Sequence, residues 1–254
     1  MNQTQQEFAA ETYAPRAADY VTSAVHAAGP DLDQIEALLA GKESAVVLDL
    51  GCGGGHISYR AAPHVAQVVA VDVTAAMLEQ VQKTAEQKGI KNIVTRQAAA
   101  EALPFADGEF DVVLCRFTAH HWQDFYAGLR EARRVLKQGG LAVFIDTVAP
   151  ASRVLDTHLQ ATELLRDASH VRNFTVAEWV AALAQAGFAL EHFTLRRLRM
   201  DFPVWTARTK TPAALVTAIR HLQQNAPEGV KSYFAIGEDG GFDIDSATFV
   251  LRTA

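Results

Sequence analysis

The sequence predicts an α/β fold built on a doubly wound, mostly parallel sheet, and two observations carry this prediction. Between residues 46 and 150, short β-branched runs alternate with longer helical stretches, which is the pattern of parallel βαβ units. These runs are almost continuously apolar, as strands covered by helices on both faces must be. With 254 residues, 49% of them hydrophobic, the chain can bury the core of one large domain with a sizeable elaboration.

The elements of this core follow from the apolar runs and the residues that end them. A helix is expected from about residue 75 to residue 88, where Gly89 stops it, and another from 125 to 136, closed by Gly139 and Gly140. The strand candidates are Val46–Leu50, Val68–Asp72, Ile93–Thr95, Asp111–Cys115 and Leu141–Ile145. Residues 46–150 therefore form a Rossmann-like core.

Helical additions are expected on both sides of the core. Residues 1–45 are predicted to form an N-terminal helical lid, in which helical spacing resumes from Leu32 to Leu39 after a break at Gly29-Pro30. Residues 151–254 are predicted to be cap helices and the final strands of the same domain. In that part the helices are expected at 154–165, 176–186 and 212–225, an alternating basic stretch at 190–202, and the last strand at 249–251.

Composition excludes several classes of protein. The formal net charge of -6 argues against non-specific binding to nucleic acid or to an anionic membrane surface. No apolar run approaches the roughly 20 residues of a membrane span, and the polar N-terminus does not read as a secretory signal. Cys52 and Cys115 are too few for a disulfide framework and are not spaced as metal ligands, so no metal site is expected. These features predict a soluble cytoplasmic protein.

The densest functional signal is a glycine cluster that directly follows the first predicted strand. Glycines at positions 51, 53, 54 and 55 let the backbone pass close to a ligand, because no Cβ atom intervenes. Asp72 ends the next strand, where a carboxylate can accept hydrogen bonds from ribose hydroxyls. Ligands of open α/β sheets bind at these strand ends, so the two signals predict an adenosine site.

The glycine pattern also narrows the kind of adenosine cofactor. A dinucleotide fingerprint starting at Gly51 would need glycine at the position of His56, and no lysine follows the glycines as a phosphate loop would require. An adenosyl ligand without a pyrophosphate fits better. The alternative, that the glycines only cap a tight turn and Asp72 only caps a helix, stays open on these residues alone.

The motifs resemble those of class I S-adenosylmethionine-dependent methyltransferases, in particular the ubiquinone/menaquinone-methyltransferase-like (type 11) group and a bacterial subgroup of it. The resemblance is carried, in chain order, by residues 20–26, 47–56, 71–72, 100–105, 110–113, 119–122, 130–140 and 169–173. It implies a seven-stranded, mostly parallel sheet with an antiparallel last strand. It also implies S-adenosylmethionine as cofactor and S-adenosylhomocysteine as product.

The same resemblance assigns cofactor contacts by position. It places the glycine loop beside the methionine moiety, Asp72 at the ribose, Met77 at the adenine face and the Arg116 backbone beside the sulfonium, although Met77 could equally be helical core. The full set that it implies is Gly51, Cys52, Gly53, Asp72, Val73, Met77, Ala100, Glu101 and Arg116.

Residues for the acceptor half of the site are expected to come from three segments. His120 and His121 follow the fourth strand at the mouth of the crevice and are candidate catalytic bases, since the pKa of histidine lies near neutrality. Packing or helix entry is the alternative role for this pair. Candidate substrate contacts are Tyr13, His26, His170 and Arg172. The alternatives are a plain salt bridge or a solvated loop for Arg172 and an ordinary amphipathic helix for His26.

The function predicted is methyl transfer to a small-molecule acceptor by in-line displacement, a reaction that mainly requires alignment and exclusion of water. An NAD(P)-dependent oxidoreductase and a non-catalytic protein that binds an adenosyl cofactor are the alternatives. The acceptor atom stays open, and so does the choice between a monomer and a homodimer.

Overall fold

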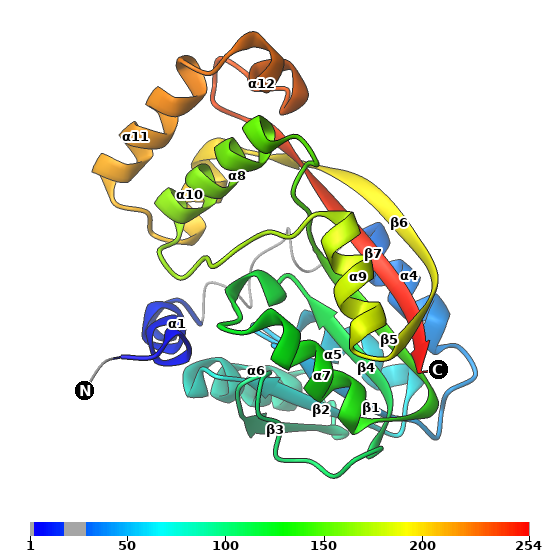
Figure 1. Cartoon of the computed structure of the whole chain (residues 1–254). Coiled ribbons are helices and arrows are strands. Elements are labelled where there is room, and N and C mark those ends of the chain that lie inside the picture. The colour runs from blue at the N-terminus through cyan, green and yellow to red at the C-terminus, as the bar shows by residue number, and fades with distance from the viewer. Residues whose placement is uncertain (1–2, 18–28, 254) are drawn as a thin grey trace.

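The computed structural model describes residues 3–17 and 29–253, and its centre is one seven-stranded sheet (Figure 1). The strand order is β3-β2-β1-β4-β5-β7-β6, and β7 runs antiparallel to the other six strands. The strands are β1 (Val46–Leu50), β2 (Gln67–Asp72), β3 (Ile93–Gln97), β4 (Phe110–Arg116), β5 (Leu136–Thr147), β6 (Phe188–Met200) and β7 (Phe242–Thr253). The predicted fold class is confirmed, including the antiparallel last strand.

Helices cover both faces of the sheet, which explains the continuous apolar runs of the strands. In β1, Val47 packs toward one face, where Leu32 and Ile35 of α4 lie, whereas Leu48 packs toward the other, against α7 and α9. The first layer holds α4 (Pro30–Leu39), α5 (His56–Ala61), the 3-10 turn η2 (Ala62–His64) and α6 (Ala75–Gln87). The second holds α7 (Phe125–Val135) and α9 (Val176–Gln185).

A separate helical cap stands beyond the carboxyl ends of the parallel strands, where β6 and β7 extend past the sheet (Figure 1). Its own core joins Leu159, Trp205, Ile219 and Phe234 to strand residues such as Phe242. The cap helices are α8 (Arg153–Arg166), α10 (Phe202–Arg208), α11 (Ala213–Gln224) and α12 (Glu228–Tyr233). The N-terminal helix α1 (Gln5–Tyr13) and the 3-10 turn η1 (Ala14–Arg16) lie below the cap in the view of Figure 1, and η1 contacts α6. The division into lid, core and cap at residues 45 and 150 stays a prediction.

The structure differs from the sequence expectation mainly at boundaries. β5 begins at Leu136 and therefore contains Gly139 and Gly140, which the sequence pattern places before the strand. Gly139 adopts a φ of +71°, and the chain bulges away from β4 there. The pairing with β4 resumes at Leu141. The alternating basic stretch is β6, which ends at Met200. There Asp201 caps a new helix, α10, that the pattern did not reveal.

Two of the three arginines of β6 pair with acidic side chains of β7 while staying partly exposed. Arg197 pairs with Asp245 at 2.9 Å, and Arg199 pairs with Asp243 at 3.1 Å. Arg196 donates to Thr248 instead. The basic stretch therefore links the two outer strands. Over the described ranges of the chain, no helix is long and apolar enough to cross a membrane.

Candidate active site

A cavity of about 380 Å³ opens at the carboxyl ends of β1, β2 and β4, between the sheet, the cap and α1. This is the position at which open α/β sheets bind their ligands. The sequence-predicted site residues that line it are Tyr13, Gly51, Cys52, Gly53, Asp72, Val73, Met77, Ala100, Glu101, Arg116, His120 and His121. The structure therefore brings together most of the residues that the sequence singled out.

The glycine loop forms the floor of the cavity and requires its glycines for two different reasons. Gly51 has a φ of +71°, and a Cβ atom there would lie 2.3 Å from Oγ1 of Thr118, so close packing excludes any side chain. Gly53 has a φ of +48° but no protein atom within 4 Å of such a Cβ. Its exposed backbone therefore faces open cavity, where a ligand can approach.

Asp72 is held by the backbone and keeps acceptor capacity. Its Oδ2 atom accepts a hydrogen bond from Gly53 N at 2.9 Å, and its Oδ1 atom accepts one from Thr74 N at 2.8 Å. Burial raises the pKa of Asp72, while these hydrogen bonds act in the opposite direction. Each carboxylate oxygen has a second lone pair, so the side chain can still bind ribose hydroxyls. The N-cap of α6 is Thr74, not Asp72.

Met77, Ala100 and Glu101 form the side wall next to Asp72. Met77 is buried in the first turn of α6 and also lines the cavity, so packing and ligand contact are both compatible with its position. The carboxylate of Glu101 accepts hydrogen bonds from the backbone of Gln123 and Asp124, which directs it toward the start of α7. The contact of Glu101 with adenine stays a prediction.

Two further carboxylates that line the cavity were not singled out from the sequence. Asp49 of β1 is buried, accepts from Ser58 Oγ at 2.6 Å and lines the cavity, and burial raises its pKa to about 7. Asp31 at the start of α4 lies 2.5 Å from Nε of Arg116, whose side chain also lines the cavity. The available signal for Asp49 was a carboxylate inside an apolar strand, directly before the glycine loop.

On the acceptor side, His120 forms a close pair with Asp146 at the end of β5. Nδ1 of His120 lies 2.6 Å from Oδ1 of Asp146, and Asp146 is buried. Burial lowers the pKa of His120, but the charge and hydrogen bond of Asp146, together with Glu163 and Asp167, raise it above 6.5 overall. Because Nδ1 is engaged by Asp146, Nε2 is the nitrogen that can serve a ligand in the cavity.

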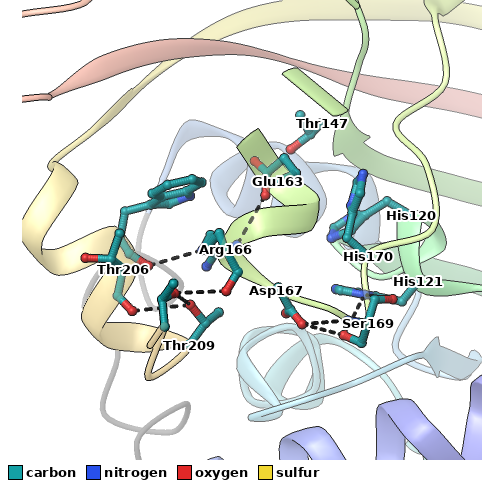
Figure 2. Close-up of polar contacts among 12 residues, drawn as sticks. His120, His121, Thr147, Glu163, Arg166, Asp167, Ser169, His170, Thr206 and Thr209 are labelled. Atoms are coloured by element: carbon teal, nitrogen blue, oxygen red, sulfur yellow. Dashed lines mark hydrogen bonds and ion pairs between the residues drawn. The ribbon is translucent and has the colours of Figure 1, made fainter. Parts of the chain in front are cut away.

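His121 lies in a different network from its neighbour (Figure 2). Its Nε2 atom is 3.1 Å from the Tyr13 hydroxyl, which also donates to Asp167, and its Nδ1 atom is 3.0 Å from Ser169 O. Burial and the charge of His120 lower the pKa of His121 to about 4, so it is neutral near pH 7. This geometry favours His120 as the proton acceptor, and the assignment of His121 as catalytic stays a prediction.

The remaining predicted substrate residues lie elsewhere. His170 is buried beside His120, with ring centroids 5.7 Å apart, and its Nε2 atom is 2.9 Å from Oε1 of Gln160. Arg172 pairs with Asp156 and Glu178 at 3.1 and 3.8 Å. Neither side chain is among the described residues that line the cavity. His26 falls outside the described residues.

The described part of the chain is expected from its sequence to hold no metal site and two buried thiols. It holds no cluster of three or more His, Cys, Asp or Glu residues that could bind a metal ion. Cys52 and Cys115 are buried free thiols, and burial raises the pKa of each.

The fold and site together define a class of protein. A glycine loop after β1, a carboxylate at the end of β2 and a cap over the carboxyl edge of a sheet with antiparallel β7 are the features of a class I methyltransferase. Residues 48–144 match the family model described as a methyltransferase domain.

Known relatives agree with this class over most of the chain. The sequence is 45% identical over 195 residues to the YafE protein of Escherichia coli K12, covering 77% of this chain and 94% of YafE. It is 35% identical over 211 residues to the methyltransferase YcgJ of Bacillus subtilis, covering 82% of this chain and 83% of YcgJ. The chain belongs to the methyltransferase family and is an enzyme of that class.

Solved structures show the same similarity. The YcgJ crystal structure matches with a TM-score of 0.84 at 31% identity, covering 88% of this chain and 97% of that one. The crystal structure of a protein from Bacillus halodurans C-125 matches with a TM-score of 0.85 at 32% identity, covering 88% and 99%.

Proposed function

We propose that the cavity binds S-adenosylmethionine at the glycine loop and Asp72, and that the enzyme transfers the methyl group to a small molecule held under the cap. The observation that carries this proposal is that Asp72, the open face of Gly53 and His120 all line one cavity. The cofactor supplies a methyl carbon already activated by a positive sulfur. The enzyme's task is to align the acceptor with that carbon and to exclude water.

The charges of the cofactor half suit this ligand. Asp49 and Asp72 line the cavity, as does Asp31, which is paired with Arg116 at 2.5 Å. S-adenosylmethionine carries positive charge on its sulfur and its amino group, which nearby carboxylates stabilise. The anionic pyrophosphate of a dinucleotide would instead face these carboxylates, and His56 stands where the dinucleotide fingerprint needs glycine.

His120 is the proposed general base. Asp146 fixes the imidazole so that Nε2 can accept a proton from an acceptor hydroxyl as its oxygen attacks the methyl carbon. Asp146 also stabilises the imidazolium that results. A proton-accepting group in the cavity favours a catalytic role over cofactor binding alone.

Calorimetric titration with S-adenosylmethionine, S-adenosylhomocysteine and NAD tests the cofactor assignment. We expect micromolar binding of both adenosyl ligands and none of NAD. The Asp72→Ala variant is expected to lose roughly tenfold or more in affinity, since it removes hydrogen bonds from a charged group. Asp107→Ala is the matched control, because its side chain is 82% exposed and pairs only at the surface with Arg134.

Two outcomes oppose the proposal. Absence of adenosyl-ligand binding by the folded wild-type chain would contradict the cofactor assignment. Binding of NAD in place of both adenosyl ligands would favour the oxidoreductase alternative.

A further inference from the structure

Asn173 lines the cavity and carries a buried amide that is unpartnered among the residues that the structure describes. The residue is 1% exposed and lines the cavity, yet within the described residues neither Oδ1 nor Nδ2 has a hydrogen-bond partner. Leaving a buried polar atom unpaired costs about 1–3 kcal/mol. A ligand with one hydrogen-bond donor for Oδ1 and one acceptor for Nδ2 would satisfy both atoms of this amide.

The backbone of Asn173 is held firmly, so its side chain is set in position. Gln160 of α8 accepts from Asn173 N at 3.0 Å and donates to Asn173 O at 2.7 Å. The same Gln160 amide also donates to Asp156 at 2.7 Å. These contacts fix the point at which the Asn173 side chain leaves the loop.

The loop that carries Asn173 is attached directly to the proposed base. Val171 N and Arg172 N both donate to the backbone oxygen of His120, at 2.9 and 3.2 Å. Asn173 follows immediately in the chain. The backbone of Asn173 is therefore tied to that of His120, and both residues line the one cavity.

The charges around His120 disfavour an anionic acceptor. Asp146, Glu163 and Asp167 all act on the His120 imidazole, and Glu163 itself lines the cavity with 7% exposure. Arginines also line the cavity, but Arg116, Arg166, Arg197 and Arg199 each pair with a carboxylate, and Arg196 donates to Thr248 and Gln34. A carboxylate next to the reacting hydroxyl would meet like charges at low solvent exposure.

We propose that Asn173 recognises an uncharged acceptor that carries a planar donor–acceptor edge, such as a carboxamide, next to its reacting hydroxyl. The ligand edge donates to Oδ1 and accepts from Nδ2 of Asn173, and the adjacent hydroxyl reaches Nε2 of His120. This inference rests on the proposed function and specifies its acceptor class.

The test measures ternary binding to the full chain saturated with S-adenosylhomocysteine, so that it does not depend on turnover. Three probes form a matched set. Salicylamide carries the carboxamide edge next to its hydroxyl, salicylate replaces the carboxamide with a carboxylate of similar shape, and phenol has neither group. We expect salicylamide to bind about tenfold tighter than either of the others, the contribution of two neutral hydrogen bonds. Asn173→Ala should reduce the affinity for salicylamide to that for phenol, without changing the affinity for S-adenosylhomocysteine.

Two further variants separate recognition from folding. Asn173→Leu keeps a side chain of similar size and should also lose the preference for salicylamide, while thermal stability stays the same or rises because unpaired polar atoms are removed. Asn225→Ala, at an exposed position after α11, should bind all three probes as the wild type does.

Several results would overturn the inference: binding of salicylate as tight as that of salicylamide, an equal effect of the Asn173 variants on all three probes, or binding of none of them to the cofactor-saturated enzyme. In each case S-adenosylhomocysteine still binds, so the proposed function stands. Failure of S-adenosylhomocysteine itself to bind identifies instead a failure of the proposed function.

Discussion

Nδ1 of His120 lies 2.6 Å from Oδ1 of Asp146, where the neighbouring strands β4 and β5 end. The Asp146 carboxylate also accepts from Thr147 N at 2.8 Å and from His120 N at 3.3 Å. These hydrogen bonds fix both the carboxylate and the imidazole. In its neutral form His120 therefore carries its proton on Nδ1 and has the Nε2 lone pair free for an acceptor.

Replacement of this imidazole should abolish most of the activity but leave the cofactor bound. For His120→Gln we expect kcat with an identified acceptor to fall about 10²–10⁴-fold, the usual contribution of a positioned general base. The affinity for S-adenosylmethionine, measured by calorimetry, should stay within about twofold of the wild type, because the cofactor residues are unchanged. A kcat that survives the substitution would remove His120 from the mechanism.

The pH profile should separate the role of Asp146 from a purely structural one. The rising limb of kcat/KM reports the loss of the His120 proton, and Asp146 raises the pKa of that group. Asp146→Asn removes the negative charge, so the limb should move to lower pH even though the maximal rate falls. The measurement is kcat/KM against pH for both proteins. An unmoved limb would show that the titrating base is another group.

The two glycines of the loop should respond differently to the same substitution. In Gly51→Ala the new Cβ meets Thr118 at a positive φ, so we expect a loss of about 1–3 kcal/mol in unfolding free energy, measured by urea denaturation. In Gly53→Ala the new Cβ enters open cavity, and we expect the larger loss in S-adenosylmethionine affinity. Equal stability losses with unchanged affinity for Gly53→Ala would place the cofactor elsewhere.

Asp49 should couple cofactor binding to stability and pH. Burial raises its pKa from 3.8 to about 7. Between these values the unfolded chain has released a proton that the folded chain keeps, so the contribution of Asp49 to stability is lost as pH rises from about 4 to about 7. Asp49→Asn removes this dependence and can still accept from Ser58.

We therefore expect the unfolding free energy of Asp49→Asn to exceed that of the wild type more at about pH 8 than at about pH 4. Its affinity for the cationic cofactor should fall at the higher pH, since the ionised carboxylate is lost. Denaturation and calorimetry at the two pH values check both effects. A parallel pH dependence of stability in the two proteins would contradict the raised pKa.

The glycine loop and Asp72 could be placed at one cavity from the sequence because their signals are local. The glycine loop and Asp72 each follow directly after an apolar strand, and the parallel order of the strands brings their ends together. Asp146 stands in the same place after the apolar run of β5, so the same signal could have found it.

The acceptor half depends on how the cap loops fold, which no local pattern reports. The sequence singled out Arg172, but the structure turns Arg172 toward Asp156 and places Asn173 in the cavity. Which of two neighbouring loop residues lines the cavity depends on the local course of the chain, which the sequence pattern does not report. Gln160, which holds this segment in place, is distant enough in sequence that no spacing rule links it to Asn173.

A crystal structure of the full chain with S-adenosylhomocysteine tests the central claim most directly. The account predicts the ribose hydroxyls at hydrogen-bond distance, about 3 Å, from the Asp72 carboxylate. It also predicts the ligand sulfur between the Gly51–Gly53 loop and His120. Ligand density at another place on the molecule, or none in this cavity at saturating concentration, would contradict the account.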